Sequence, residues 1–244
     1  MAGSSGPEPR SLRDMAHLPT AVIEVESLSL ARGGRPVLRG VDARFGRGRI
    51  SAVVGPSGAG KTSLLRCLNR LEEPEAGSVL LDGADVRSIE PTLLRRRVGM
   101  IFQVPVLFPG GLRSNLAYGL NGVTTEKMNA SLEAAGLSAS FLERDSTTLS
   151  VGQAQRACIA RALMRDPEVL LMDEPTSSLD RDAAARIEAL IGSLAGNGLT
   201  IVVVTHNLEQ AQRVASDALL LVDGRVTASG TPSEVERSWP EGAR

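Results

Sequence analysis

Long apolar runs are absent from this sequence, and without them a chain cannot cross a bilayer. The longest apolar stretches, such as residues 201–204 and 218–222, fall far short of the roughly 20 residues that a spanning helix needs. Residues 1–19 contain charged residues and prolines but no apolar core of the signal-peptide kind, and we interpret them as a flexible tail. The sequence therefore predicts a chain without a membrane span.

Cysteine is scarce, and acidic and basic residues are nearly balanced. Only Cys67 and Cys158 occur, neither in a CxxC spacing nor beside a histidine, so we expect two buried free thiols rather than a metal site or a disulfide. The 27 basic and 28 acidic residues leave a net charge of -1. A nucleic-acid partner is therefore not expected.

What the sequence does contain is the pattern of an α/β protein. With 244 residues, 42% of them hydrophobic, the chain can bury a substantial core. Residues 21–54 alternate as strands do and predict an antiparallel β region that leads into a central strand. Beyond Pro167, strand and helix patterns alternate, which predicts a mostly parallel sheet flanked by helices. Helical patterns over residues 125–135 and 151–165 predict an inserted helical subdomain.

A glycine-rich segment lies between a predicted strand and a predicted helix. It reads Gly55-Pro56-Ser57-Gly58-Ala59-Gly60-Lys61-Thr62 and matches GxxxxGK[ST]. Glycines let successive N–H groups and the helix N-terminus face the β-phosphate of a nucleotide, and Lys61 adds charge on the β- and γ-phosphate oxygens. We expect Thr62 to reach Mg²⁺ and Ser63 the α-phosphate region. An ordinary glycine-rich turn is the alternative, and the complete motif in this context argues against it.

Two acidic residues end the apolar strand pattern of residues 169–172. Asp173 and Glu174 would lie at the carboxyl edge of a parallel sheet. There they would be beside the glycine-rich segment at residues 55–62, which we call the phosphate loop. Asp173 suits a Mg²⁺ site, and Glu174 suits polarising the water that attacks the γ-phosphate. A solvated pair of carboxylates at a strand end is the alternative interpretation.

A second candidate anion site begins at Ser150. This residue is placed like a helix N-cap, with Gly152 and Gln153 in the first turn that follows. Capped helices with a small residue near their start are common, so this segment alone is weak evidence for a ligand site.

Taken in order, these motifs resemble the ATPase subunit of an ABC transporter over about residues 22–232. They are the phosphate loop, Gln103, LSVGQ at residues 149–153, MDEP at residues 172–175, Ser178-Leu179-Asp180 and Val204-Thr205-His206. The combination is far more specific than any single motif. It implies a P-loop NTPase core, with the N-terminal β region and the helical subdomain added to it.

The resemblance also implies roles and partners. Gln103 and His206 join Glu174 in catalysis, and Gln103 with Thr62 and Asp173 belongs to the Mg²⁺ site. Two copies would form a head-to-tail dimer that holds each ATP between residues 55–63 of one copy and Ser150, Gly152 and Gln153 of the other. A separately encoded transmembrane permease would be the partner, with this chain peripheral on the cytoplasmic face of the membrane.

The implied domain bounds follow the same resemblance. Residues 20–236 would form the ATPase domain, with the helical subdomain at about residues 104–165. Residues 1–19 and 237–244 would be tails.

Two positions depart from the family pattern. Val151 stands where the signature most often has glycine, and the segment before Gly33-Gly34 lacks the aromatic residue that often stacks on adenine. Arg32 could cover the base with its planar guanidinium or could be an exposed surface arginine. Loose base selectivity is therefore expected.

The transported substrate is predicted only by similarity within the family. Residues 95–110 together with LSVGQAQR are similar to bacterial iron-export ATPases and a plant aluminium-tolerance ATPase, and phosphate-import ATPases are similar in the surrounding stretches. Export of a metal or metabolite ranks first and phosphate import second. An ABC-type ATPase without a transport role is the alternative of another class.

The apolar run at residues 104–108 has two interpretations: packing in the core, or a groove for a helix of the partner.

Overall fold

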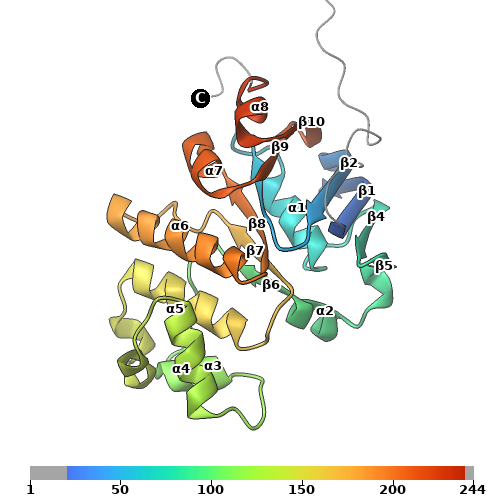
Figure 1. The fold of residues 1–244 in the computed structure, drawn as a ribbon. Helices are drawn as coiled ribbons and strands as arrows, with labels where there is room; N and C mark the ends of the chain where they lie inside the picture. Colours follow the sequence, from blue (N-terminus) through green and yellow to red (C-terminus); the bar gives the residue numbers. More distant parts are fainter. Residues whose placement is uncertain (1–20, 240–244) are drawn as a thin grey trace, which may run out of the picture.

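The computed structural model describes residues 21–239 of the chain (Figure 1). The predicted tail at residues 1–19 and the last part of the predicted tail at residues 237–244 lie outside the described residues. Trp239, within the described part, packs against the hydrophobic core.

The first sheet is the antiparallel region that the sequence predicts. It contains β1 (Ala21–Arg32), β2 (Arg35–Gly46), β4 (Ala76–Leu81) and β5 (Ala84–Asp85) in the order β2-β1-β4-β5. Gly33 and Gly34 form the turn between β1 and β2 with positive φ angles of 56° and 76°, which glycine adopts without steric cost. This hairpin places Arg32 at the tip of the sheet.

The second sheet has six strands in the order β10-β9-β3-β8-β7-β6. They are β3 (Ile50–Val54), β6 (Val98–Ile101), β7 (Val169–Asp173), β8 (Thr200–Thr205), β9 (Asp217–Val222) and β10 (Arg225–Gly230). All neighbours pair in parallel except β10, which runs antiparallel to β9. The mostly parallel sheet is confirmed, with β3 and β8 at its centre.

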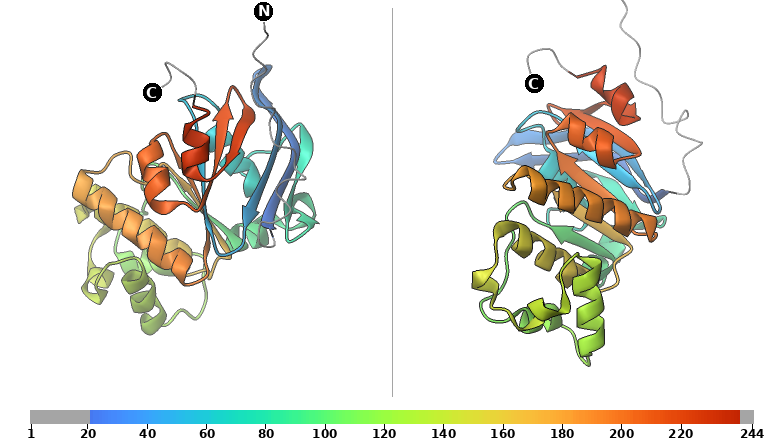
Figure 2. Two further views of the ribbon diagram at one scale, coloured as in Figure 1. Left: turned by 45° about the horizontal axis from the view of Figure 1, so that its top comes forward. Right: turned by 60° about the vertical axis from the view of Figure 1, so that its left-hand side comes forward.

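Eight α-helices of the described chain surround these sheets. They are α1 (Lys61–Leu68), α2 (Pro91–Arg97), α3 (Leu112–Ala117), α4 (Thr125–Ala134), α5 (Val151–Leu163), α6 (Arg181–Gly196), α7 (Leu208–Val214) and α8 (Pro232–Glu236). Short 3-10 turns cover Val86–Ser88, Ala139–Glu143 and Ser146–Thr148. Figure 2 shows α3, α4 and α5 gathered at one end of the molecule, away from the antiparallel sheet.

Two hydrophobic clusters fill the interior, one on each face of the six-stranded sheet. In β3, Ala52 and Val54 belong to the cluster shared with α3, α4, α5, α6 and α7, whereas Val53 belongs to the cluster under the antiparallel sheet and α1. Successive strand side chains point to opposite faces, so a strand covered on both sides is apolar throughout. Cys67 and Cys158 are buried free thiols, as predicted.

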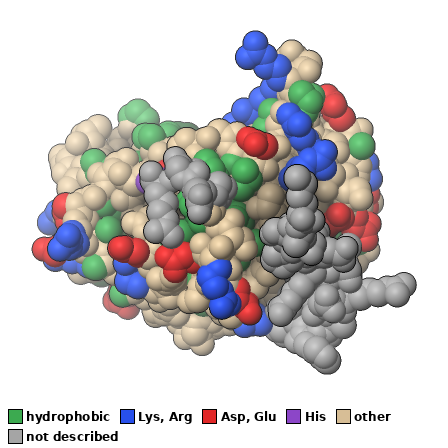
Figure 3. Space-filling model, turned by 90° about the horizontal axis from the view of Figure 1, so that it is seen from above, with side chains coloured by type: hydrophobic (Ala, Val, Ile, Leu, Met, Phe, Trp, Pro, Cys, Tyr) green, Lys and Arg blue, Asp and Glu red, His purple; other side chains and the backbone are tan. Residues whose placement is uncertain are grey.

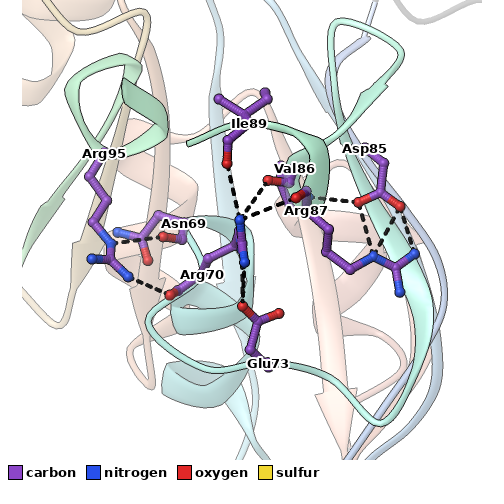
Figure 4. A network of polar contacts seen from close by, with 8 residues as sticks. All are labelled: Asn69, Arg70, Glu73, Asp85, Val86, Arg87, Ile89 and Arg95. Carbon is purple, nitrogen blue, oxygen red and sulfur yellow. Dashed lines mark hydrogen bonds and ion pairs between the residues drawn. The ribbon is translucent and has the colours of Figure 1, made fainter. Parts of the chain in front are cut away.

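A polar network ties α2 to the end of α1 (Figure 4). The Arg70 guanidinium donates to the carbonyl oxygens of Val86 at 3.3 Å and Ile89 at 3.0 Å, and Arg95 of α2 donates to the carbonyl oxygens of Asn69 at 3.3 Å and Arg70 at 2.6 Å. These bonds satisfy carbonyl groups in an irregular stretch, as buried backbone requires. They hold the chain from α1 to β6 in place.

No helix within residues 21–239 has the length and apolar character of a membrane span. In the face that Figure 3 draws, basic and acidic side chains of the described residues lie interspersed.

Candidate functional site

The phosphate loop connects the end of β3 to α1. Gly55, Gly58 and Gly60 have positive φ angles of 152°, 79° and 102°. A Cβ atom at Gly55 would lie 2.0 Å from the carbonyl oxygen of Leu221, and one at Gly60 would lie 2.8 Å from that of Val37. Both positions therefore require glycine. Gly60 is the N-cap of α1, and no side chain caps this helix, so its first N–H groups remain available to an anion.

Lys61 is drawn inward over this loop and is only 5% exposed. Its Nζ donates to the carbonyl oxygens of Gly55 and Pro56, each at 2.8 Å. Burial lowers the pKa of this ammonium group, and the nearby carboxylates of Glu174 and Asp173 oppose that shift. The carbonyl groups of the loop thus hold the lysine side chain in place. Ser63 of α1 is also buried.

Asp173 ends β7 beside the loop. It accepts a hydrogen bond from Thr62 Oγ1 at 2.9 Å and is 5% exposed. Burial raises the pKa of its carboxyl group, the Thr62 hydrogen bond lowers it, and the Glu174 charge raises it, for a net rise. Within residues 21–239 there is no cluster of three or more acidic, histidine or cysteine side chains that could hold a metal ion alone. A hydroxyl and one carboxylate fit Mg²⁺ that takes its other ligands from nucleotide phosphates and water.

Glu174 occupies an unusual backbone conformation. Its φ angle is +43°, a left-handed region that costs free energy for a residue other than glycine. Its N–H donates to the carbonyl oxygen of Val204 at 3.0 Å, and its carbonyl oxygen accepts the Ser177 hydroxyl at 3.1 Å. These bonds hold the strained residue at the sheet edge.

The three predicted catalytic residues meet at one carboxylate oxygen. Glu174 Oε2 lies 3.1 Å from His206 Nδ1 and 3.4 Å from Gln103 Nε2. The three residues follow β7, β8 and β6, which are neighbours in the sheet, so their parallel carboxyl ends bring these side chains together. The arrangement can orient the Glu174 carboxylate and leave it as a hydrogen-bond acceptor for water.

Thr176, Ser177 and Gln210 support this cluster and were not identified from the sequence, whereas Thr205, which also contributes, stands in the motif Val204-Thr205-His206. Ser177 Oγ accepts a hydrogen bond from Gln103 Nε2 at 3.2 Å. The buried Gln210 of α7 accepts from Thr205 Oγ1 at 2.7 Å and donates to Thr176 Oγ1 at 2.8 Å, which links the histidine strand to the loop after Glu174. A cavity of about 650 Å³ opens between α6 and α7 beside these residues.

Ser150, Gly152 and Gln153 lie elsewhere, at the start of α5. Ser150 Oγ accepts from the Gln153 N–H at 3.3 Å, and Gln153 Oε1 accepts from the Ser150 N–H at 3.1 Å, so the two residues form a capping box. They line a cavity of about 450 Å³ with Asp180 of the α6 N-cap, apart from the residues of the phosphate loop. Val151, between Ser150 and Gly152, is 49% exposed.

Arg32 has both an exposed surface and a partner. Arg32 lies at the hairpin tip, and its side chain is 51% exposed. Its guanidinium forms an ion pair with Glu72. Arg66 of α1 also bonds to Glu72 at 3.2 Å. The guanidinium is therefore held at one edge, whereas its two faces carry no aromatic ring contact among the described residues.

The apolar run after Gln103 is mostly exposed. Val104, Val106 and Phe108 are 65%, 59% and 42% exposed, so core packing is wrong for these three side chains. It is right for Leu107, which packs against the core. The exposed side chains line a groove of about 230 Å³ with Tyr118, whose ring centroid lies 4.3 Å from that of Phe108.

Comparisons with known proteins agree on one family. A family model described as "ABC transporter" matches residues 38–177. "ABC transporter I family member 17" from Arabidopsis thaliana is 44% identical over 222 residues, 88% of this chain and 84% of that protein. "Protein STAR1" from Oryza sativa is 46% identical over 84% of this chain, which spans only 61% of that protein. "Phosphate import ATP-binding protein PstB" from Mycoplasma mobile is 39% identical over 88% of this chain and 83% of that protein.

Solved structures show the same fold. The chain superimposes on "cbiO1" from Clostridium perfringens, described as part of an ABC transporter complex, with a TM-score of 0.82 and 27% identity over 89% of this chain and 91% of that one. It also superimposes on a dimeric ATP-binding cassette bound to ADP and phosphate after hydrolysis, with a TM-score of 0.75 and 27% identity over 86% of this chain and 98% of that one.

Proposed function

This chain belongs to the ABC transporter family as an ATP-binding subunit, an ATPase whose hydrolysis is coupled to transport, and on that premise we propose that it drives a separately encoded transmembrane permease. The catalytic and nucleotide-binding roles are assigned on one observation: Gln103 and His206 both contact Glu174, beside Lys61 and the Thr62–Asp173 pair. Each of these side chains suits one requirement of phosphoryl transfer.

Nucleotide binding is assigned to the phosphate loop and the start of α1. The uncapped N–H groups of α1 and the buried Lys61 face the β- and γ-phosphates, and Ser63 serves the α-phosphate region. Thr62, Asp173 and Gln103 would hold Mg²⁺, which neutralises phosphate charge when bound. Lys61 would exchange its bonds to the Gly55 and Pro56 carbonyl groups for bonds to phosphate oxygens.

Hydrolysis is assigned to Glu174. Its carboxylate accepts a hydrogen bond from water, whose oxygen bonds to the γ-phosphorus while the bond to the β–γ bridging oxygen breaks. Glu174 takes one proton from the water and returns it to the departing phosphate, so that ADP and a phosphate carrying both water protons leave. His206 and Gln103 hold the Glu174 carboxylate in the required orientation.

A head-to-tail dimer would complete each site. Ser150, Gly152 and Gln153 are set apart from the phosphate loop within one chain, which fits a contact made with nucleotide on a second copy. The Ser150 cap uses an oxygen lone pair, so the hydroxyl hydrogen can still donate to a phosphate. A solved relative of the same fold is a dimer with ADP and phosphate bound.

The permease would dock in the groove lined by Val104, Val106 and Phe108, with this chain peripheral on the cytoplasmic face of the membrane. Residues 20–236 would form the ATPase domain and residues 104–165 its helical subdomain. Export of a metal or metabolite is the first candidate for the transported substrate. Phosphate import is the second, because relatives with that printed name are 39% identical.

The test is purification of the tagged full chain from its native membranes, mass spectrometry of the proteins that remain bound, and an ATPase assay with and without them. Recovery of one multispan protein that stimulates hydrolysis supports the proposal. Recovery of soluble proteins alone contradicts it and favours an ABC-type ATPase without a transport role. Transport of phosphate or of metal ions into or out of vesicles that contain the purified complex then decides between the two substrates.

A further inference from the structure

The segment that exposes the apolar groove has no regular backbone pairing. Residues 103–109 follow β6 and form neither helix nor strand. Outside helices and strands, no backbone-to-backbone hydrogen bond of the described chain involves them. Backbone groups that lack water must find partners, so side chains from other elements have to set the position of this segment.

One face of α5 supplies these partners. Gln155 Nε2 donates to the carbonyl oxygen of Phe102 at 3.3 Å, and Arg161 donates to that of Val106 at 2.7 Å. Cys158 Sγ lies 3.6 Å from the same Val106 oxygen. The three α5 residues are spaced by three positions, which places them along one side of the helix. This face of α5 therefore holds the backbone from Phe102 to Val106 and turns the apolar side chains outward.

Asn115 of α3 extends the same support. Its Oδ1 accepts from the Phe108 N–H at 2.8 Å, and its Nδ2 donates to the Phe108 carbonyl oxygen at 3.0 Å. Arg161 of α5 donates to this Oδ1 at 3.4 Å. Asn115 is buried, with 1% exposure, so the contact is shielded from water.

Burial of the Gln155 side-chain amide costs free energy, which indicates that its hydrogen bond to Phe102 matters. The residue is 1% exposed, and its Oε1 is buried without a hydrogen-bond partner in the described protein. An apolar side chain would avoid this unsatisfied group, whose burial is costly. The polar contact to Phe102 is what a glutamine provides here and an apolar residue does not.

The other end of α5 carries the proposed nucleotide contact. At 1.5 Å per residue, Gln155 and Arg161 lie about 8 Å and about 16 Å along the helix from Ser150. We propose that Gln155 and Arg161 are positioning residues that make residues 102–108 move with α5, so that nucleotide contact at Ser150 alters the permease groove. This inference rests on the proposed function, because the contact at Ser150 comes from nucleotide on a second copy.

Hydrogen–deuterium exchange tests this inference on the full chain with magnesium and ATP as the probe. The parent is Glu174→Gln, in which bound ATP is expected to persist and to hold the dimer. ATP should slow exchange at residues 150–153 of the parent and change exchange at the amides of residues 103–108 other than Pro105, which has no N–H. Light scattering on the same sample reports the dimer.

Two variants in this parent remove the bonds from α5. Gln155→Leu and Arg161→Met should keep the ATP-dependent dimer and the change at residues 150–153, but lose most of the change at residues 103–108. Arg113→Met is the matched control: Arg113 lies on α3 in the same helical part of the fold, and its guanidinium donates to Glu143 Oε1 at 3.2 Å and to Thr125 Oγ1 at 3.1 Å. It should keep both changes.

The outcomes separate the inference from the proposed function. If Gln155→Leu and Arg161→Met retain the full change at residues 103–108, or if the parent forms the dimer without that change, the inference is wrong. If the parent binds ATP but never dimerises, the proposed dimer fails and the inference fails with it. Since Arg161 also lies over the Phe108 ring, Gln155→Leu is the milder variant and decides the result if Arg161→Met does not fold.

Discussion

Gln103 joins two regions of the molecule, the candidate catalytic site at the carboxyl edge of the six-stranded sheet and the apolar segment at residues 104–108. The two regions are built in opposite ways. At the sheet edge, Lys61 and Asp173 are each 5% exposed and their side chains are held by hydrogen bonds within the protein. In the next segment, Val104 and Val106 are 65% and 59% exposed, and it is the backbone that is held. Groups that meet a phosphate need fixed side chains, because charge placement governs catalysis. A docking surface needs a fixed backbone with side chains left open for a partner.

Removal of the Glu174 carboxylate tests the catalytic side of this comparison most severely. Glu174→Gln should lower the ATP hydrolysis rate by about 10²- to 10⁴-fold, because it removes the proposed general base, and should leave ATP binding intact. Steady-state ATPase and binding assays measure the two effects. The control is Glu209→Gln, which removes a carboxylate from the lining of the same cavity. Normal turnover in Glu174→Gln would remove this residue from its assigned role.

Removal of the buried ammonium group comes next in size. Lys61→Ala should weaken ATP affinity by about 10- to 100-fold, from the roughly 1.5–3 kcal/mol of hydrogen bonds to a charged group. Calorimetric titration with ATP measures it. Lys127→Ala is the matched control, since Lys127 is the other lysine of the chain and pairs with Asp166 at 2.6 Å. Equal affinity in the two variants would refute the assignment of Lys61 to phosphate.

A charge placed in the groove should affect stimulation by the permease without affecting basal ATP hydrolysis. Val106→Asp should reduce stimulation of the ATPase by the permease about tenfold, since interface residues that matter contribute more than about 1 kcal/mol. Basal hydrolysis should not change, because the Val106 carbonyl group that Arg161 holds is still present. Leu93→Asp is the control, an exposed apolar residue of α2 outside the groove lining. Loss of basal activity would show that the regions are not separable in this way.

The smallest expected effect concerns the base. Arg32→Tyr should tighten binding of both ATP and GTP about fivefold, near the lower end of the roughly 1–3 kcal/mol that base stacking contributes. Competition between the two nucleotides measures it, with Arg32→Ala as the control for loss of the Glu72 ion pair alone. A gain for ATP without one for GTP would contradict stacking as the cause.

Much of the fold could be predicted because its signals are local. The capping box of Thr231 and Glu234 at the start of α8 is one such signal, because its two residues stand three positions apart with Pro232 at the first helical position. The α2 helix was not predicted, although Pro91 at its first position and the Glu90 cap are typical of a helix start. The β10 strand was also missed, although Asp223 and Gly224 form the turn of a hairpin. The α3 helix has six residues, too few for a clear helical period.

The sequence motifs predict the residues of the candidate site one by one but not their arrangement. The motifs identify Gln103, Glu174 and His206, and nothing in their spacing says that all three meet at one oxygen. Ser177 and Gln210 carry no distinctive pattern, and only their contacts reveal their support of the site.

The sequence by itself determined the phosphate loop, the acidic strand end and the family, because a tight glycine turn, a helix start and a strand end depend on residues a few positions apart. Tertiary structure alone decided two other features. The strand order β8-β7-β6 brings His206, Glu174 and Gln103 together, and the polar face of α5 turns Val104 and Val106 outward. Both depend on contacts between residues far apart in the chain, for which a local pattern carries no signal.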